Sequence, residues 1–379
     1  MRVKGKPTQT RRQRRDTMPT IAAVRTAVPP HVVTSEEARD FALHLFGDAF
    51  RDIERLLLLF DHTQIQSRHF CKPLPWFRES HSFAEKNEAY VQAALALSAD
   101  CARRALAAAN VAPDSVDAIL FVSSTGISTP SLDAAIAQTL GLRQDVRRLP
   151  IWGLGCAGGA SGLARASDYA LAHPAATVLL IAAELCGLTF IPSDRSKSNL
   201  VGSALFADGA AAVVIRGDLV TDLANGAMEG RDAVQIVGSR SHLWPDSEDV
   251  MGWEVCDAGL SVIFSRDIPS LVRREMAGQV DQLLSSHHLD RSDLSHFIAH
   301  PGGAKVLDAY QESLDLPKTY LDDARAVLQD FGNMSSPTVL FVLERFLERR
   351  RRNEIEGGYG VLAALGPGFS CEQVLLQVD

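Results

Sequence analysis

Apolar runs bounded by turn residues alternate with alanine-rich stretches along the first half of the chain. The stretch from residue 87 to residue 110, NEAYVQAALALSADCARRALAAAN, has the length and the small residues of a helix that packs closely in a core. Four shorter runs have the apolar character of buried strands, at residues 21–30, 116–125, 176–185 and 209–216. This alternation predicts an α/β chain.

The second half of the chain repeats the same kind of pattern. Strands and helices are predicted in turn by residues 233–242, 295–300, 301–314, 322–331 and 358–378. Each half then has a strand, a polar or glycine-rich loop, a helix and another strand, although no repeat of individual residues is visible. We therefore expect two similar halves, residues 19–225 and residues 226–379.

Composition and charge narrow the class of protein. The 379 residues are 46% hydrophobic and 22% charged, which is typical of a globular protein with a sizeable core. A formal net charge of −8 argues against a nucleic-acid-binding protein. Residues 1–17 are strongly basic but lack the apolar core of a secretory signal. We expect residues 1–18 to be a disordered basic leader, with Met18 as an alternative start.

Apolar run lengths and cysteine spacing bear on location and metal binding. The longest apolar run, ATVLLIAAEL, is about half the roughly 20 residues that a transmembrane helix needs, so no transmembrane segment is predicted. Six cysteines are scattered without C-x-x-C spacing, which predicts neither a disulfide framework nor a zinc site. We expect a cytoplasmic protein without a metal ion.

The stretch PIWGLGCAGGASGLARA, residues 150–166, permits two interpretations. Gly153, Gly155 and Gly158 form G-x-G-x-x-G, and Glu184 follows near the place where a dinucleotide-binding fold has its acid. Against this, residues 147–152 resemble a poor buried strand. Alternatively, Cys156 lies at a helix entrance, where the helix dipole and unpaired N–H groups favour a reactive thiolate. It could also be a small buried hydrophobic residue.

A nucleophile needs partners, and two residues of the second half qualify. His300 ends a predicted strand and precedes a glycine turn, from which its imidazole can point into a cleft. Asn333 follows Gly332 and precedes a predicted helix, so it is either a functional amide or a helix N-cap. His300 could equally be a structural histidine. Cys156, His300 and Asn333 in this order are more specific together than each residue is alone.

From about Thr20 to the C-terminus the chain resembles the type III polyketide synthases, the chalcone synthase-like members of the thiolase superfamily. The resemblance rests on GLGCAGG, AHPGGAKVLD, GNMSSPTVLFVLE, VGSALFADGAAAVV and GPGF. It implies an α/β, thiolase-like fold with duplicated αβαβα layered halves and an active site between them. It also implies a homodimer.

The resemblance implies a reaction and roles for particular residues. Cys156 would hold an acyl starter, and His300 and Asn333 would stabilise the enolate formed when malonyl-CoA loses carbon dioxide. Iterative decarboxylative Claisen condensation and cyclisation would follow. Acyl-CoA and malonyl-CoA are substrates here, and no cofactor is implied. The family's gatekeeper phenylalanine falls at Phe206, and its C-terminal scaffold loop falls at Gly366, Pro367, Gly368 and Phe369.

Departures from the plant pattern bear on the substrate. Val262 stands where the plant enzymes have a second gatekeeper Phe, Cys186 stands at a position that is usually Thr, and Trp253 at one that is often Gly. These features look more like the bacterial and fungal alkylresorcinol and alkylpyrone synthases, which accept long fatty acyl-CoA starters. Thr189 and Ser335 complete the implied substrate-binding positions.

Two further positions of the family pattern are altered. The basic contacts to the CoA phosphates map to Arg55, Leu58 and His62, of which only Arg55 clearly keeps its charge, so an acyl carrier protein is an alternative donor. The methionine that reaches across the plant dimer falls at Thr129.

Three alternatives remain open from the sequence. A ketoacyl-acyl carrier protein synthase III-like enzyme shares Cys, His and Asn but stops after one condensation. A catalytically silent homologue would bind acyl-CoA without reaction. A dinucleotide-binding dehydrogenase follows from the glycine pattern alone.

Overall fold

The computed structural model describes residues 18–220 and 234–378. In its first part, five strands form one half of a large sheet in the order β5-β4-β6-β7-β1. β4 is parallel to β5 and β6, whereas β7 is antiparallel to both β6 and β1. Their bounds are β1 Thr20–Ala27, β4 Ala118–Val122, β5 Arg147–Ile151, β6 Thr177–Leu185 and β7 Asp208–Arg216.

The second part of the chain repeats this topology with one strand fewer. β11 is parallel to β12, and β13 is antiparallel to both β12 and β8. A short β1–β8 contact at Thr20 and Gln235 joins the two groups into a nine-stranded sheet. The duplicated architecture predicted from the sequence is therefore confirmed. The bounds are β8 Val234–Leu243, β11 Leu294–Ala299, β12 Gly358–Gly366 and β13 Ser370–Val378.

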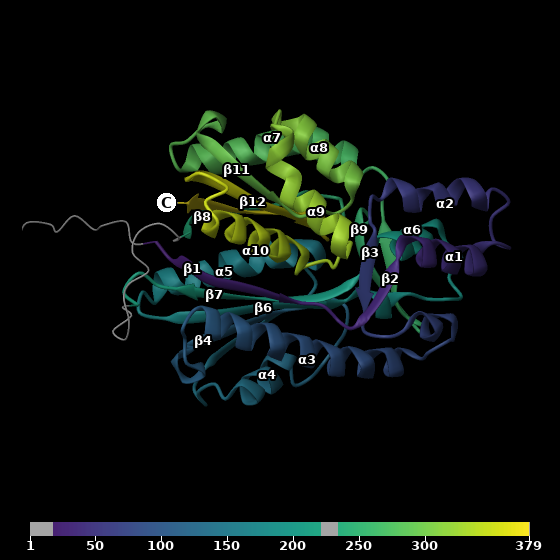
Figure 1. Ribbon diagram of the computed structural model, residues 1–379, viewed down its shortest axis with the longest axis horizontal. Helices are drawn as coiled ribbons and strands as arrows, with labels where there is room; N and C mark the ends of the chain where they lie inside the picture. The colour runs from purple at the N-terminus through teal and green to yellow at the C-terminus, as the bar shows by residue number, and fades with distance from the viewer. Residues whose placement is uncertain (1–17, 221–233, 379) are drawn as a thin grey trace, which may run out of the picture.

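Helices form three layers around the two groups of strands, as Figure 1 shows. α5 and α10 lie between the groups, where α5 packs on β6 and β13 and α10 packs on β1 and β11. α3 and α4 cover the outer face of the first group, and α7 and α8 cover that of the second. The bounds are α3 Phe83–Ala108, α4 Leu132–Leu140, α5 Gly158–Ala172, α7 Ile268–Ser286, α8 Ala304–Leu314 and α10 Thr338–Arg351.

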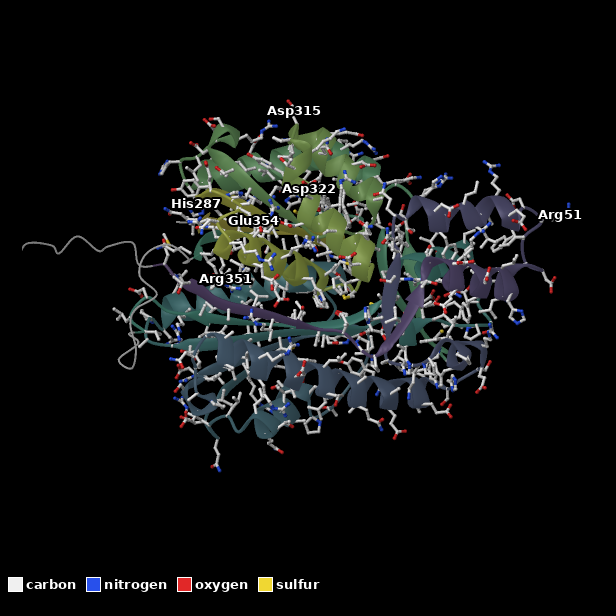
Figure 2. The ribbon with its side chains drawn as sticks, viewed as in Figure 1. Arg51, His287, Asp315, Asp322, Arg351 and Glu354 are labelled. Atoms are coloured by element: carbon white, nitrogen blue, oxygen red, sulfur yellow. The ribbon has the colours of Figure 1, made fainter. Side chains whose placement is uncertain are left out.

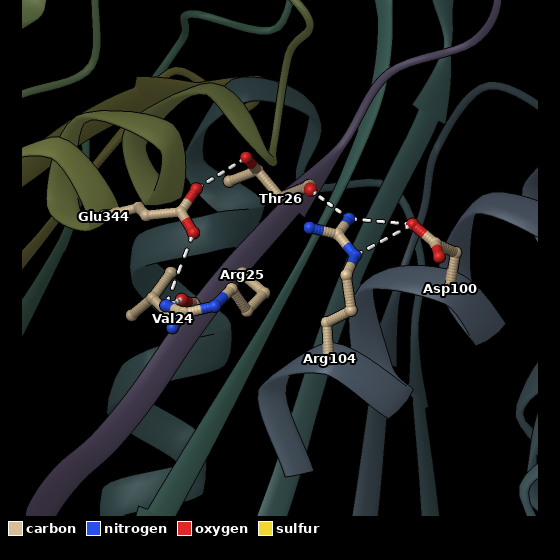
Figure 3. A network of polar contacts seen from close by, with 6 residues as sticks. All are labelled: Val24, Arg25, Thr26, Asp100, Arg104 and Glu344. Atoms are coloured by element: carbon tan, nitrogen blue, oxygen red, sulfur yellow. Dashed lines mark hydrogen bonds and ion pairs between the residues drawn. The ribbon is translucent and has the colours of Figure 1, made fainter. Parts of the chain in front are cut away.

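Polar contacts tie strand β1 to the helices on both of its faces (Figure 3). Thr26 Oγ1 donates a 2.6 Å hydrogen bond to Glu344 of α10. On the other face, Arg104 of α3 donates to the Thr26 carbonyl and pairs with Asp100. Thr26 of β1 is therefore hydrogen-bonded to α10 of the middle layer and to α3 of the outer layer, and these bonds help to hold both helices against the sheet.

Two helices and two short strands form an apolar extension at one end of the molecule, beside α6 Lys197–Leu205 (Figure 1). A separate hairpin of β9 Met251–Cys256 and β10 Gly259–Phe264 contacts α6. α9 Asp322–Phe331 ends at Gly332, whose φ of 71° suits glycine. The extension contains α1 Ser35–Phe46, α2 Ile53–His62, β2 His31–Thr34 and β3 Ser67–Phe70.

Charged side chains project from the periphery, for example Arg51 and Asp315 in Figure 2. Within the described ranges no helix is long and apolar enough to cross a membrane. Residues 1–17 of the expected leader, and the expected boundary between residues 225 and 226, lie outside the described residues.

Candidate active site

Cys156 lies in a short turn, Gly155–Ala157, that leads directly into α5. Its side chain is buried, and its Sγ lies 3.9 Å from Oδ1 of Asn333. The two residues are 177 positions apart in the chain and meet where α5 and the turn before α10 face each other. The position predicted for Cys156, at a helix entrance, agrees with the structure.

His300 follows the last residue of β11 and donates its backbone N–H to Ala363 of β12. Its imidazole is buried, and neither ring nitrogen has a hydrogen-bond partner among the described residues. The ring lines one cavity, the catalytic cavity, together with Cys156 and Asn333. A structural histidine would have its nitrogens satisfied, so this environment favours a functional role.

Asn333 is fixed by its backbone and by its side chain. Its Oδ1 accepts from the Ser335 N–H at 2.8 Å, and its Nδ2 donates to the Gly302 carbonyl at 3.2 Å. The residue before α10 is Pro337, so the N-cap alternative for Asn333 is wrong. One amide hydrogen of Nδ2 is engaged, which leaves the second to serve a ligand in the cavity.

Burial governs the pKa values of the Cys156–His300 site. It raises the pKa of the Cys156 thiol to about 11, against the lowering effect of side-chain hydrogen bonds with Ser335 and Asn333. It also lowers the pKa of His300 to about 3. The lowered thiol pKa expected from the helix entrance is therefore outweighed, because a single charge is costly in this enclosed site. Both shifts favour the uncharged forms, a neutral thiol and a neutral imidazole.

The glycines around Cys156 permit close packing between elements. A Cβ on Gly159 would lie 2.2 Å from the Ser336 carbonyl oxygen, beside the Asn333 turn. A Cβ on Gly155, whose φ is +46°, would lie 2.8 Å from Pro367 of the GPGF loop. These glycines thus bring the Asn333 turn and the GPGF loop onto the segment that carries the nucleophile.

The structure does not support the dinucleotide-binding alternative. The amide N–H groups of Gly153 and Gly155 donate to Ser124 Oγ, so they are not free to bind a phosphate. Glu184 is fully buried and accepts hydrogen bonds from the Ser124 N–H and from the hydroxyls of Thr125 and Ser336. A carboxylate held in this way cannot reach a ribose. Burial raises the pKa of Glu184 to about 7.

Several implied substrate-binding residues line a second, apolar cavity. Phe206 and Val262 line this cavity and also a smaller one that contains Cys156, Trp253, Ser335 and Pro367. Phe206 and Val262 therefore form the wall between the apolar cavity and the nucleophile. The apolar cavity is also lined by Cys186, Thr189, Phe190 and Arg68.

A groove leads to the catalytic cavity, with which it shares the lining residues Phe264, Ile268, Gly302 and Val306. Lys197, Arg266 and Lys305 line it, and none of the three forms an ion pair with a described carboxylate. They lie where α6, α7 and α8 begin, and helix N-termini favour anions. His62 also lines the groove, but Arg55 and Leu58 do not.

Sequence reasoning did not single out Arg68 or these three cations. Arg68 lies in a short polar-looking strand, and nothing in its neighbours indicates burial. The cations come from separate elements, so no local spacing marks them. Only the alternation of apolar and polar residues in SRHF, residues 67–70, carries a weak signal for an inward-pointing Arg68.

Comparison with known proteins gives consistent matches over most of the chain. Residues 6–219 match the family model for the N-terminal domain of chalcone and stilbene synthases, and residues 235–378 match the C-terminal domain. A putative chalcone synthase of Bacillus subtilis is 46% identical over 94% of this chain and 97% of its own length. A 1,3,6,8-tetrahydroxynaphthalene synthase of Streptomyces peucetius is 39% identical over 94% and 92%.

Solved structures agree with these matches. The 1,3,6,8-tetrahydroxynaphthalene synthase of Streptomyces coelicolor, a bacterial type III polyketide synthase, superposes with a TM-score of 0.86 at 31% identity, over 95% of this chain and 99% of its own. PKS-I of the brown alga Ectocarpus siliculosus gives 0.88 at 27% identity, over 97% and 100%.

Proposed function

The chain belongs to the chalcone and stilbene synthases, a family of type III polyketide synthases, and on this premise we propose that it extends a fatty acyl starter on Cys156 with malonyl units. Such enzymes are acyltransferases. The observation that carries the proposal is the single buried cavity shared by Cys156, His300 and Asn333.

Loading begins with attack of Cys156 on the thioester of an acyl-CoA. His300 takes the thiol proton as the carbon–sulfur bond forms, so the pair ionises without a change in net charge. The released CoA thiolate recovers that proton from His300. Burial lowers the pKa of His300 and so favours the neutral imidazole, which is the form that can act as a base.

Extension uses the same cavity for a different step. Asn333 Nδ2 and His300 donate hydrogen bonds to the thioester oxygen of malonyl-CoA as its carboxylate leaves as carbon dioxide. Negative charge moves onto that oxygen, and each preorganised donor is worth on the order of 3 kcal/mol. The enolate carbon attacks the Cys156 thioester, forms the new carbon–carbon bond and releases the Cys156 thiolate. Transfer of the lengthened chain back to Cys156 starts another round.

The fatty starter is supported by the apolar cavity behind Phe206 and Val262. Valine is smaller than the phenylalanine that the plant enzymes carry at this position, which leaves a wider passage from Cys156 to the cavity. Phenylalanine and leucine side chains also line this cavity, an environment suited to an alkyl chain. The products we propose are alkylpyrones or alkylresorcinols, formed by lactonisation or aldol cyclisation.

Delivery by CoA is supported by the charge of the groove. Lys197, Arg266 and Lys305 line its walls, and no acid stands among its described lining residues, although the protein has a net charge of −8. Phosphates bind such a combination of cations and helix N-termini. We propose that these residues take the role expected of Arg55, which lies outside the groove lining. A carrier-protein donor remains an outcome that the assay below distinguishes.

A homodimer is supported by the edge strand β5. Leu149 on this strand and Trp152 just after it are exposed, and Ile127 on the adjoining loop is exposed as well. An edge strand with unpaired backbone groups and exposed apolar side chains is suited to pairing with a second copy.

The test is to incubate the purified protein with malonyl-CoA and saturated acyl-CoAs of graded length, and to identify products by mass. We expect two or more malonyl units per product, and we expect starters of ten or more carbons to be preferred. Cys156→Ala is the control and abolishes all condensation. Products with one malonyl unit would favour the single-condensation alternative, and no product with any starter contradicts the synthase proposal. Reaction only with acyl carrier protein thioesters would contradict delivery by CoA.

A further inference from the structure

Arg68 of β3 is a buried cation with no buried counter-ion among the described residues. Its side chain is only 2% exposed, and no described carboxylate forms an ion pair with it. Burial lowers its pKa to about 10, so it remains charged at neutral pH. A buried charge of this kind is costly unless hydrogen bonds compensate for it, which raises the question of what Arg68 does.

The Arg68 guanidinium binds the segment that carries Phe206. Its Nη1 donates to the carbonyl of Ser203 at 2.5 Å and to the carbonyl of Phe206 at 3.1 Å. Both carbonyls lie at the C-terminal end of α6, where the chain turns into the wall of the apolar cavity. Charge-assisted hydrogen bonds are stronger than neutral ones, so this end of α6 is firmly held.

The aliphatic part of Arg68 packs against the segment that carries Asn333. A Cβ on Gly332 would lie 2.8 Å from Arg68 Cγ, so glycine permits this contact. The two segments are also joined directly, because the Asn333 N–H donates to the Leu205 carbonyl and the Ala207 N–H donates to the Asn333 carbonyl. Arg68 therefore touches both sides of this junction.

We propose that Arg68 is a positioning residue that fixes the wall residue Phe206 and the amide of Asn333 relative to each other. One buried side chain then sets both the boundary of the acyl cavity and the donor that stabilises the enolate. The inference rests on the proposed function, because it assigns Asn333 to decarboxylation. It predicts that loss of Arg68 impairs decarboxylation more than it impairs loading of Cys156.

The test compares the two half-reactions in Arg68→Met and Arg68→Lys. We expect Arg68→Met to lower kcat for malonyl-CoA decarboxylation about 10- to 100-fold, the effect of a misplaced catalytic group, with KM little changed. Acylation of Cys156, followed by intact mass, should change far less, because the hydrogen bonds of Arg68 go to Ser203 and Phe206 and not to the turn that carries Cys156. Arg68→Lys keeps the charge and one hydrogen bond, so it should recover part of the lost rate.

Lys86→Met is the matched control. Lys86 is also buried, and its Nζ donates to the carbonyls of Phe190 and Ala258, far in sequence from Asn333. If Arg68 has a purely structural role, Lys86→Met and Arg68→Met should both lower the thermal stability of the protein. Both variants should then reduce the decarboxylation rate only slightly and to a similar extent. A folded Arg68→Met variant with the wild-type decarboxylation rate overturns the inference.

If Arg68→Met does not fold, Arg68→Gln decides the question, because it keeps a polar side chain but has neither the charge nor the reach of the guanidinium. A wild-type rate in that variant also overturns the inference. Wild-type protein that does not decarboxylate malonyl-CoA would instead contradict the proposed function. The two failures are therefore distinguishable.

Discussion

At the scale of single residues, the proposed role of His300 as the base for Cys156 can be tested directly. Because burial raises the thiol pKa to about 11, little thiolate exists at neutral pH without a base that accepts the proton. We expect His300→Gln to lower the rate of Cys156 alkylation by iodoacetamide at pH 7 by more than about 10-fold. Mass spectrometry of the labelled protein measures this rate. Equal rates in the two proteins would show that the thiol is activated by other means.

Glu184 gives the stability of the protein a pH dependence of known sign. Its pKa is about 7 in the folded protein and 4.5 in the reference state. Between these pH values the native state holds a proton that the unfolded chain has lost, so stability falls as pH rises through this window and is constant above it. The total change is on the order of 3 kcal/mol. Urea unfolding at pH 5 and pH 8 measures it.

Glu184→Gln is the matched variant for this measurement, since it keeps the shape and cannot ionise. The loss of stability from pH 5 to pH 8 should be smaller in the variant than in the wild type. Asp208→Asn offers a second comparison, because burial raises the pKa of Asp208 to about 6 and the corresponding window ends at a lower pH. An identical pH dependence in wild type and Glu184→Gln would contradict the assignment.

The sequence located the candidate catalytic residues but not their electrostatics. Cys156, His300 and Asn333 could be predicted because each lies at an element boundary that motifs mark. The raised thiol pKa could not, because it depends on how completely distant segments enclose the sulfur. Arg68 and Glu184 are hydrogen-bonded to residues that lie 59 to 152 positions away in the chain, and no local sequence pattern reveals such partners.

At the scale of elements, the β9–β10 hairpin shapes the passage between the two cavities. Its Val262 lines both cavities, and its Trp253 lies with its ring 5.8 Å from that of Phe206. We expect Val262→Phe to narrow the passage and to shift the starter preference from long to short acyl-CoAs by about 10-fold or more in kcat/KM. Competition between two acyl-CoAs of different length measures the shift.

Val262→Ile serves as the control for that substitution, because it adds one methylene group and should leave the preference nearly unchanged. If Val262→Phe retains the wild-type preference, the alkyl chain takes a path that avoids the hairpin.

Most elements agree with the sequence prediction, and β5 is the instructive difference. Residues 147–152 resemble a poor buried strand, since two arginines precede a proline. The structure has a strand here, but at the edge of the sheet, where its residues are largely exposed. Proline is tolerated at an edge because no neighbour needs its missing N–H. Hydrophobicity identifies central strands well, whereas it says little about edge strands.

At the scale of the whole molecule, the exposed edge at β5 makes the oligomeric state testable. We expect Leu149→Lys to weaken self-association, because it places a charge in the proposed interface. Leu43→Lys is the matched control, because Leu43 is 39% exposed and Leu149 is 37% exposed. Leu43 lies on α1, at the opposite end of the molecule from β4, the strand that pairs with β5 (Figure 1). Sedimentation velocity measures both variants. A dimer that is equally stable in both contradicts an interface at β5.

The groove that shares Phe264 and Gly302 with the catalytic cavity has a kinetic consequence. If starter and extender both enter through it, the first CoA product must depart before malonyl-CoA can bind. The enzyme would then alternate between free and acylated forms, and double-reciprocal plots would give parallel lines. Excess starter would compete with malonyl-CoA for the acylated form and slow extension. The supply ratio of the two substrates, as well as the cavity, would then influence how long each polyketide grows.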